Sequence, residues 1–295
     1  MRVAVSGGTG FLGRHIIAAL RAHGHQPVSL SRRPFAENEV PHLPLDLAST
    51  CPSAEDFRRL EIEALIHCAW DFSSPNTAQY GRANIEGARR LVEAATQAGV
   101  KRLLDISSMS AFPGCRSTYG HTKLAVEAIF ADAGGMVLRP GLIWGENAGG
   151  IVGTLDGLVR RLPVVPLIGI GNQALFLVHV EDLAELVCRI VAAPVFPVGR
   201  LVTAAVDEPV PLRRILELRA QGLGVARAFL PVPWRLIWLL LRAVETVAPG
   251  RGPRSDNVLG FIYSDPAPRF EALHQLAPGF RGFRRFTAPA PAGVN

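Results

Sequence analysis

The chain opens with an apolar strand that runs directly into a glycine-spaced turn and then into a helix. The run Val-Ala-Val-Ser-Gly-Gly-Thr-Gly-Phe-Leu-Gly starts at residue 3 and places glycines at positions 7, 10 and 13. Gly7 permits a tight turn, Gly10 lets the backbone approach a diphosphate, and Gly13 lets the helix pack close to the strand. The helix N-terminus offers free N–H groups and a partial positive charge to the anion. The turn therefore predicts a dinucleotide site that includes Gly7, Gly10, Phe11, Leu12 and Gly13.

The end of the next strand predicts which dinucleotide binds. The strand at 26–30 is followed by Ser31, Arg32 and Arg33. A site for NAD commonly places Asp or Glu here to accept hydrogen bonds from the ribose 2′-OH. A hydroxyl and two guanidinium groups instead suit a 2′-phosphate, although these arginines could also be solvated loop residues. We expect Ser31, Arg32 and Arg33 to contact NADP, with NAD as the alternative cofactor.

The composition describes a globular protein without a nucleic-acid or metal signature. Hydrophobic residues make up 48% and charged residues 19% of the 295 positions, which is sufficient for a sizeable core. The formal net charge of +6 comes from scattered arginines that are not interleaved with aromatic residues, so no nucleic-acid stripe is expected. The four cysteines lie far apart, which argues against a metal site and a disulfide framework. Without a signal peptide, we expect a cytoplasmic protein that acts on a small-molecule substrate.

Strand-like and helix-like segments alternate through the first half of the chain. This alternation predicts an α/β fold of the Rossmann type, a doubly wound parallel sheet with helices on both faces. Expected strands lie at 26–30, 42–47, 64–69, 101–106 and 136–139, and expected helices at 11–21, 53–60, 76–99 and 117–132. Beyond residue 140 glycine- and proline-rich segments mix with helices near 150–161, 181–193, 211–219 and 233–247. We expect a dinucleotide-binding domain at 1–140, with core elements continuing to about 193, a small C-terminal substrate-binding lobe at 141–286, and a disordered tail at 287–295.

The most apolar helical stretch begins at Trp234. It is too short to span a bilayer, and Arg235, Arg242 and Glu245 fall on one side of it, so it predicts an amphipathic helix and no transmembrane segment. Packing on the protein itself is the favoured interpretation, and weak peripheral contact with a membrane is the alternative.

Tyr119 and Lys123 stand four residues apart on an expected helix and therefore share one face. Ser108 follows the preceding strand, at the end where an α/β sheet forms its ligand crevice. This trio suits hydride transfer to a carbonyl. A phenol has a reference pKa of about 10, and a nearby ammonium stabilises its ionised form, so that the phenol can exchange a proton at neutral pH. The lysine can also hold the nicotinamide ribose, and the serine hydroxyl can orient the substrate oxygen.

The ordered motifs of the first 190 residues resemble those of the extended short-chain dehydrogenases/reductases, the NAD-dependent epimerase/dehydratase family. The motifs are Gly7-Gly-Thr-Gly10-Phe-Leu-Gly13, Asp46-Leu47, His67-Cys-Ala69, Asn84-Ile-Glu-Gly87, Ser107-Ser108, Tyr119-Gly-His-Thr-Lys123, Leu138-Arg-Pro-Gly141 and Val178-His-Val-Glu-Asp182.

The resemblance implies a role for most of these residues. Asp46 and Leu47 would flank the adenine, and the backbone of Ala69 would approach the cofactor. The catalytic set would be Ser108, Tyr119 and Lys123, with Ser108 preferred to Ser107 from its spacing to Phe112. Asn84, His179 and Asp182 would be structural. Relatives also pair protomers through helices such as those at 76–98 and 117–132, so a homodimer is an open expectation.

Departures from the family pattern bear on the substrate. Nucleotide-sugar members usually carry an arginine just before the Val-His-Val strand, whereas this chain has Ala174-Leu-Phe-Leu177. Without that charge-assisted contact a nucleotide diphosphate would bind weakly. Each aromatic residue near the strand ends could simply pack in the core, but together they predict an apolar pocket for a hydrophobic or cyclic substrate. The expected pocket residues are Trp70, Phe72, Met109, Phe112 and Trp144.

We therefore expect an NAD(P)-dependent oxidoreductase that transfers hydride between NADP(H) and a carbonyl or alcohol. The first alternative is a nucleotide-sugar epimerase or dehydratase that recycles a bound NAD. The second is a dinucleotide-binding protein without catalysis, which the retained tyrosine and lysine disfavour.

Overall fold

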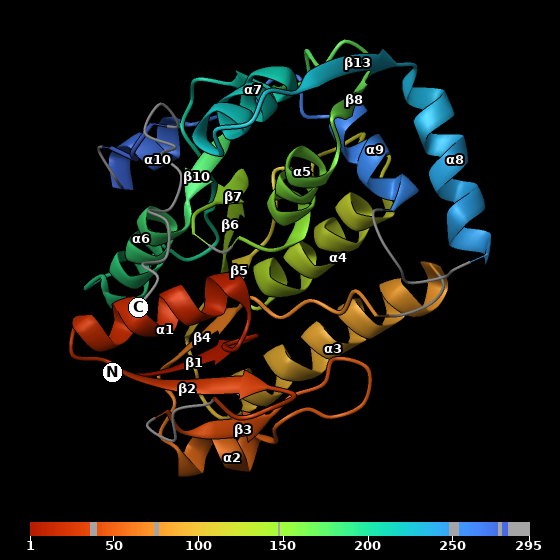
Figure 1. Ribbon diagram of the computed structural model, residues 1–295. Helices are drawn as coiled ribbons and strands as arrows, with labels where there is room; N and C mark the ends of the chain where they lie inside the picture. The colour runs from red at the N-terminus through yellow and green to blue at the C-terminus, as the bar shows by residue number, and fades with distance from the viewer. Residues whose placement is uncertain (36–39, 74–76, 147, 248–253, 277–278, 283–295) are drawn as a thin grey trace, which may run out of the picture.

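A seven-stranded parallel sheet forms the centre of the molecule (Figure 1). The computed structural model describes residues 1–35, 40–73, 77–146, 148–247, 254–276 and 279–282. The strand order is β11-β6-β5-β4-β1-β2-β3, and every pairing in this sheet is parallel. The strands are β1 (Arg2–Ser6), β2 (Gln26–Ser31), β3 (His42–Pro44), β4 (Ala64–His67), β5 (Arg102–Ile106), β6 (Met136–Pro140) and β11 (Leu201–Ala204). The expected α/β class and Rossmann-type sheet are confirmed.

Helices cover both faces of this sheet, because its strands are apolar on both sides. On one face α1 and α6 contribute Ile16, Leu20 and Val187 to a core cluster with β1 and β6. On the other face α2, α3 and α4 contribute a second cluster that includes Leu91 and Phe130. These helices are α1 (Phe11–Ala22), α2 (Ala54–Arg59), α3 (Thr77–Gln97), α4 (Thr118–Asp132) and α6 (Val180–Ala192).

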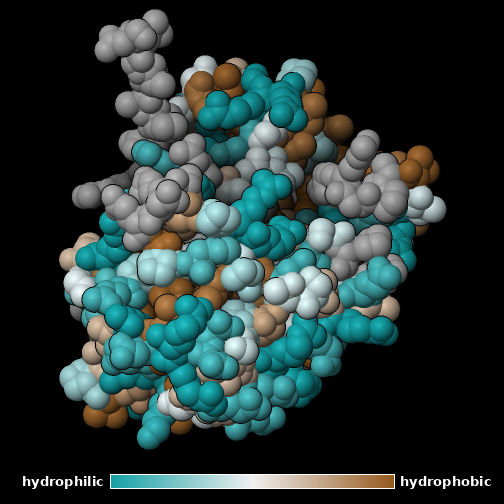
Figure 2. All heavy atoms as spheres, turned by 90° about the horizontal axis from the view of Figure 1, so that it is seen from below, coloured by the Kyte–Doolittle hydropathy of each residue, from teal (hydrophilic) through white to brown (hydrophobic). Residues whose placement is uncertain are grey.

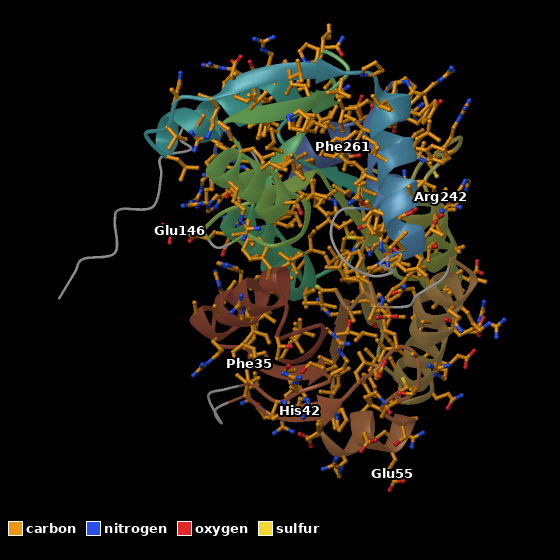
Figure 3. All side chains as sticks on the ribbon, turned by 45° about the vertical axis from the view of Figure 1, so that its right-hand side comes forward. Phe35, His42, Glu55, Glu146, Arg242 and Phe261 are labelled. Atoms are coloured by element: carbon orange, nitrogen blue, oxygen red, sulfur yellow. The ribbon has the colours of Figure 1, made fainter. Side chains whose placement is uncertain are left out.

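The second half of the chain builds a smaller lobe beside the sheet, the upper part of Figure 3. Its separate core packs α5 and α7 against β8 and β13. Besides α6 and β11, the second half contains β7 (Leu142–Trp144), α5 (Gly150–Arg161), β8 (Val164–Ile168), β9 (Ala174–Leu175), β10 (Leu177–His179), β12 (Val210–Pro211), α7 (Leu212–Gly222), β13 (Ala228–Val232), α8 (Trp234–Val247), α9 (Ser255–Ile262) and α10 (Glu271–Leu276). Of these, α10 packs against β11 and the core of the central sheet. The strands among them form three two-stranded sheets, β10-β7, β12-β9 and β13-β8.

The two halves interleave more than a division at residue 140 suggests. β11 comes from the second half but pairs with β6 at the edge of the central sheet, beyond the limit of about 193 expected for core elements. The division at 140 therefore stays a prediction, and the expected tail at 287–295 lies outside the described residues. The face seen from below in Figure 2 is mostly hydrophilic, with hydrophobic residues in small groups.

Candidate active site

The turn between β1 and α1 has a backbone that glycine alone fits well. Gly7 has a φ of +69°, and a Cβ there would lie 2.9 Å from the backbone N and Cα of Ala69. A Cβ at Gly13 would collide with the Gly7 carbonyl oxygen, to which the Gly10 N–H donates at 2.8 Å. No side chain caps α1, whose N-cap residue is Gly10. The free helix N–H groups and the close backbone approach fit a dinucleotide diphosphate.

A cleft of about 300 Å³ lies over this turn, at the carboxyl ends of β1, β2 and β4. The chain leaves β1 toward β2 and β3 on one side and later returns to β4 on the other, which is the switch point where such sheets bind ligands. The cleft brings together most of the predicted cofactor residues, namely Gly7, Gly10, Phe11, Leu12, Gly13, Ser31, Arg32, Asp46, Leu47 and Ala69.

Of the two arginines after β2, Arg32 lies in the cleft wall and Arg33 does not line it. Both side chains are exposed. The buried hydroxyl of Ser31 donates a hydrogen bond to the Arg33 carbonyl at 2.6 Å, and this bond shapes the turn. A basic group is thus present at the cleft, and it comes from Arg32.

Tyr119 and Lys123 lie one turn apart on α4, beside the same cleft. The Lys123 side chain is 3% exposed, and its Nζ donates to the Ile106 carbonyl at 2.7 Å. The same Nζ lies 4.0 Å from the centre of the Trp70 ring. The ring of Tyr119 contacts the ring of Trp70 edge-on, with 5.4 Å between the ring centres, and stacks with the ring of Phe72, with 6.4 Å between the centres. The phenol and the ammonium therefore meet two cleft-lining aromatic residues.

Two adjacent serines follow β5, and their surroundings differ. The Ser107 hydroxyl is buried and donates to the Glu127 carboxylate, which also pairs with Arg139 at 2.6 Å. The Ser108 hydroxyl is partly exposed and accepts a hydrogen bond from the Ser110 N–H at 3.1 Å. Ser108 therefore keeps an O–H that it could donate to a substrate oxygen, whereas Ser107 belongs to a buried ionic network.

Asp256 is a site-supporting residue that the sequence patterns do not indicate. Its carboxylate accepts hydrogen bonds from the backbone N–H groups of Thr118 at 2.7 Å and Tyr119 at 3.0 Å. The Ser117 hydroxyl accepts a third bond from the Gly120 N–H at 3.0 Å. These acceptors satisfy the N-terminus of α4 and fix the turn that carries Tyr119. Asp256 lies 137 residues further along the chain, so no local signal could identify it.

Two buried polar side chains lie next to Lys123 on neighbouring strands. His67 and Asp105 are register partners on β4 and β5, and both are fully buried. Burial and the nearby charge of Lys123 lower the pKa of His67 to about 3. Burial raises the pKa of the Asp105 carboxyl to about 7, against the opposing effect of Lys123. An acid in the middle of an apolar strand was the sequence signal that could have singled out Asp105.

The five aromatic and sulfur-containing residues of the expected substrate pocket do not lie together. Trp70 and Phe72 line the cleft and contact Tyr119. Phe112 and Trp144 are only 6% and 5% exposed, and Trp144 belongs to a core cluster of the smaller lobe. Met109 is partly exposed but does not line the cleft. Phe112 and Trp144 thus fill the core, where their apolar area is removed from water.

The remaining motif residues make local contacts. The Asn84 side chain accepts from the Asp71 N–H at 2.8 Å and donates to the Asp71 and Tyr80 carbonyls. His179 is the N-cap of α6 and packs edge-on against Trp144. The Asp182 carboxylate accepts from the backbone and guanidinium of Arg281 at 2.8 Å each.

Within the described ranges, no cluster of three or more His, Cys, Asp or Glu side chains is placed to hold a metal ion. In the same part of the chain, no helix combines the length and hydropathy needed to cross a membrane.

Comparison with known proteins identifies relatives of both the sequence and the fold. The chain is 34% identical over 200 residues to a ceramide reductase of Caulobacter vibrioides; the match covers 65% of this chain and 62% of that protein, so the chain spans less than two thirds of this relative's length. It is 26% identical over 260 residues to the 4-hydroxy-2-methyl-3-oxo-4-farnesyl-3,4-dihydroquinoline-1-oxide ketoreductase of Stigmatella aurantiaca, covering 80% of this chain and 77% of that protein.

Among solved structures, MoeE5 in complex with UDP-glucuronic acid and NAD superposes with a TM-score of 0.67 at 22% identity, covering 90% of this chain and 95% of that one. This likeness concerns the fold. The model of the NAD dependent epimerase/dehydratase family matches residues 3–203, which include the glycine turn, Ser108, Tyr119 and Lys123. The chain belongs to the NAD dependent epimerase/dehydratase family.

Proposed function

We propose that this protein is an NADP(H)-dependent oxidoreductase that interconverts a carbonyl and an alcohol on an apolar substrate. The observation that carries the proposal is the placement of Tyr119 and Lys123. Both lie against Trp70, which also lines the cleft above the glycine turn. A proton donor, a fixed positive charge and a dinucleotide cradle thus meet at one end of the sheet, as hydride transfer requires.

Each residue of the trio has a role that follows from its surroundings. In the direction of reduction Tyr119 gives its phenolic proton to the oxygen of the nascent alkoxide, and in oxidation its phenolate takes the proton of the alcohol. The buried ammonium of Lys123 stabilises that phenolate, because two opposite charges attract strongly where water is excluded. Ser108 donates its O–H to the substrate oxygen and polarises the carbonyl. The bound dinucleotide supplies or accepts the hydride.

Arg32 supports NADP as the cofactor. It is the exposed guanidinium in the cleft wall after β2, where a 2′-phosphate would find a charge-assisted partner. The nucleotide released from freshly purified, denatured protein tests this choice. An empty site that takes up NADPH in preference to NADH is the expected result. Stoichiometric retained NAD+ would instead indicate an internally recycled cofactor and an epimerase or dehydratase.

The substrate class is inferred from the cleft. Phe72 is 60% exposed and stacks with Tyr119, so an apolar group beside the reacting carbon would bury its surface there. The stretch before β10 carries Phe176, which packs against Phe270 at 5.2 Å, in place of a diphosphate-binding arginine. Two relatives are named as reductases of ceramide and of a farnesylated quinoline, and these names support a lipophilic carbonyl substrate.

The substitution Tyr119→Phe tests the proposal against a matched control. We expect the variant to lose NADPH-dependent turnover of apolar ketones and to keep NADPH affinity, because only the phenolic oxygen is removed. Tyr263→Phe, which removes the same atom from a tyrosine outside the cleft, should keep turnover. Equal loss of turnover and of NADPH binding in Tyr119→Phe would point to a structural role and contradict the proposal.

Two further properties stay predictions. A homodimer through α3 and α4 would be detected by analytical ultracentrifugation. A reducing, cytoplasmic setting is supported by the four cysteines, which are all free thiols.

A further inference from the structure

Helix α8 is an apolar helix that the described part of the chain leaves largely uncovered. No residue of α8 is buried, although the sequence favoured packing on the protein itself. Its uncovered face carries five aliphatic side chains at helical spacing, all of them about half exposed or more: Leu236 at 48%, Leu239 at 57%, Leu240 at 58%, Val244 at 50% and Val247 at 87%. We call this set the α8 apolar face.

The opposite side of α8 is fixed to α9. The Glu245 carboxylate accepts hydrogen bonds from the Ser255 N–H at 2.7 Å and from the Ser255 hydroxyl at 2.8 Å. The ring of Trp234 meets Tyr263 edge-on at 6.2 Å. Figure 1 shows α8 at the edge of the molecule with α9 beside it, and Figure 3, in which α8 comes forward, labels Arg242 on α8 and Phe261 on α9. These contacts orient the α8 apolar face outward.

The exposed charges of α8 are positive and border its apolar face. Arg235 and Arg242 are seven residues apart, so they lie on the same side of the helix, and both are exposed. Glu245 is the only acidic residue of α8, and its carboxylate is bound to Ser255 and lies 3.7 Å from Arg242. An apolar stripe bordered by arginines matches the boundary between acyl chains and anionic lipid headgroups.

We propose that α8 docks the protein on the surface of an anionic lipid bilayer, with the α8 apolar face in the acyl-chain boundary and Arg235 and Arg242 at the headgroups. The 14 residues of α8 give a length of about 21 Å, which is shorter than a hydrocarbon core of about 30 Å, so the helix lies in the membrane plane. A second copy of the chain fits less well. The five exposed side chains offer roughly 400 Å² of apolar surface, about half of what each partner of a stable dimer commonly buries.

Docking through α8 would bring the candidate active site close to the bilayer. α9 connects the docking helix to the site, since Asp256 caps the turn that carries Tyr119. Just before α9, the Arg254 guanidinium donates to the Phe72 carbonyl at 2.7 Å. A lipophilic substrate could then enter the cleft from the membrane. This delivery rests on the proposed reductase function, whereas the docking itself does not.

Vesicle flotation tests the docking. The full chain is mixed with unilamellar vesicles made of equal parts phosphatidylcholine and phosphatidylglycerol, or of phosphatidylcholine alone. We expect flotation with the anionic vesicles, and a loss of at least about twentyfold in partitioning for Leu239→Glu combined with Leu240→Glu. The double variant Val195→Glu with Val198→Glu, which changes apolar residues outside α8 that are at least as exposed as Leu239 and Leu240, should float like the parent.

The arginines supply a second arm of the test. Replacing both Arg235 and Arg242 by alanine should weaken binding to the anionic vesicles about fivefold per arginine. Absence of flotation in the parent chain, or equal flotation of the Leu239/Leu240 variant, would overturn the proposal. So would a parent dimer that does not float and that the leucine variant converts to a monomer. Turnover of a water-soluble ketone, measured in the same variants, reports on the reductase function separately, because the leucine changes lie outside the cleft.

Discussion

The adjacent residues Ser107 and Ser108 allow catalysis and stability to be separated by two single substitutions. Ser107 is 4% exposed and donates to Glu127, which keeps both hydrogen bonds from Arg139, at 2.8 and 2.6 Å, when Ser107 is removed. The loss is therefore one charge-assisted hydrogen bond and not the whole ion pair. Such a bond contributes about 1.5–3 kcal/mol. We expect Ser107→Ala to lower the free energy of unfolding by about 2 kcal/mol.

That loss corresponds to a melting temperature lowered by roughly 3 °C in a chain of this size. Ser108→Ala should instead change stability little and lower activity strongly. Its hydroxyl accepts a single bond from the Ser110 N–H on a partly exposed turn, so its loss should change stability by less than about 1 kcal/mol. If the hydroxyl polarises the carbonyl, kcat/KM should fall roughly a hundredfold to a thousandfold, as for other donors to a developing oxyanion.

The assay pairs thermal melts of both variants with NADPH-dependent reduction of the same ketone. The reasoning predicts a less stable but active Ser107→Ala protein and a stable but nearly inactive Ser108→Ala protein. The reverse pattern, a stable and inactive Ser107→Ala beside a fully active Ser108→Ala, would refute the assignment of Ser108. Similar loss of turnover in both would show that the ionic network of Glu127 positions the site as a whole.

Three further substitutions test the cofactor site and the buried charges. Arg32→Glu should weaken NADPH binding about tenfold to a hundredfold while leaving NADH binding similar or better, as measured by fluorescence titration; an unchanged preference would exclude Arg32 as a phosphate ligand. Gly13→Ala should lose dinucleotide binding and about 1–3 kcal/mol of stability, because the new Cβ meets the Gly7 carbonyl, whereas Gly157→Ala, with open space around it, should keep both. Burial raises the pKa of Asp105 to about 7, so the folded state binds this proton more tightly than the unfolded state does. The contribution of the bound proton to the free energy of unfolding is therefore complete below about pH 4 and is lost as the pH rises to about 7. Urea unfolding of Asp105→Asn should therefore give a free energy of unfolding nearly equal to that of the parent at about pH 4, and one higher by up to about 4 kcal/mol at about pH 8. An equal effect at both pH values would contradict the assigned shift.

The parts of the fold and site that the sequence predicted are those fixed by short-range geometry. The glycine turn needs a positive φ at Gly7 and no side chain at Gly13, and both requirements are visible in eleven consecutive letters. Tyr119 and Lys123 are one helical turn apart, so the period of the helix places them together without knowledge of the rest of the chain. The parallel sheet likewise follows from the alternation of strands and helices.

Residues that depend on long-range packing could not be assigned in this way. Asp256 reaches Tyr119 only because α9 packs against the start of α4. Trp144 follows a strand as a cleft residue would, yet it is buried in the smaller lobe. The residues of that core come from separate segments of the chain, and no sequence pattern showed that they pack together. The exposure of α8 could not be predicted either, since the amphipathic pattern of a helix does not show whether its apolar face packs against the protein or lies uncovered.

His67 and Asp105, the buried polar pair next to Lys123, lower the stability of the fold at a position close to the candidate site. The Ser6 hydroxyl accepts bonds from the Cys68 and Ala69 N–H groups, so it donates its own proton to Nδ1 of His67, and the remaining proton of this neutral imidazole is on Nε2. Among the described residues, neither that Nε2 nor either oxygen of Asp105 has a hydrogen-bond partner, an arrangement that costs stability. The pair also sets the charge around Lys123. A neutral His67 adds no second positive charge, and an acid at Asp105 faces the one cation, Lys123, that the proposed chemistry needs. As the pH rises through about 7 and Asp105 loses its proton, a negative charge appears beside Lys123 in the interior, so the charge next to this lysine depends on pH.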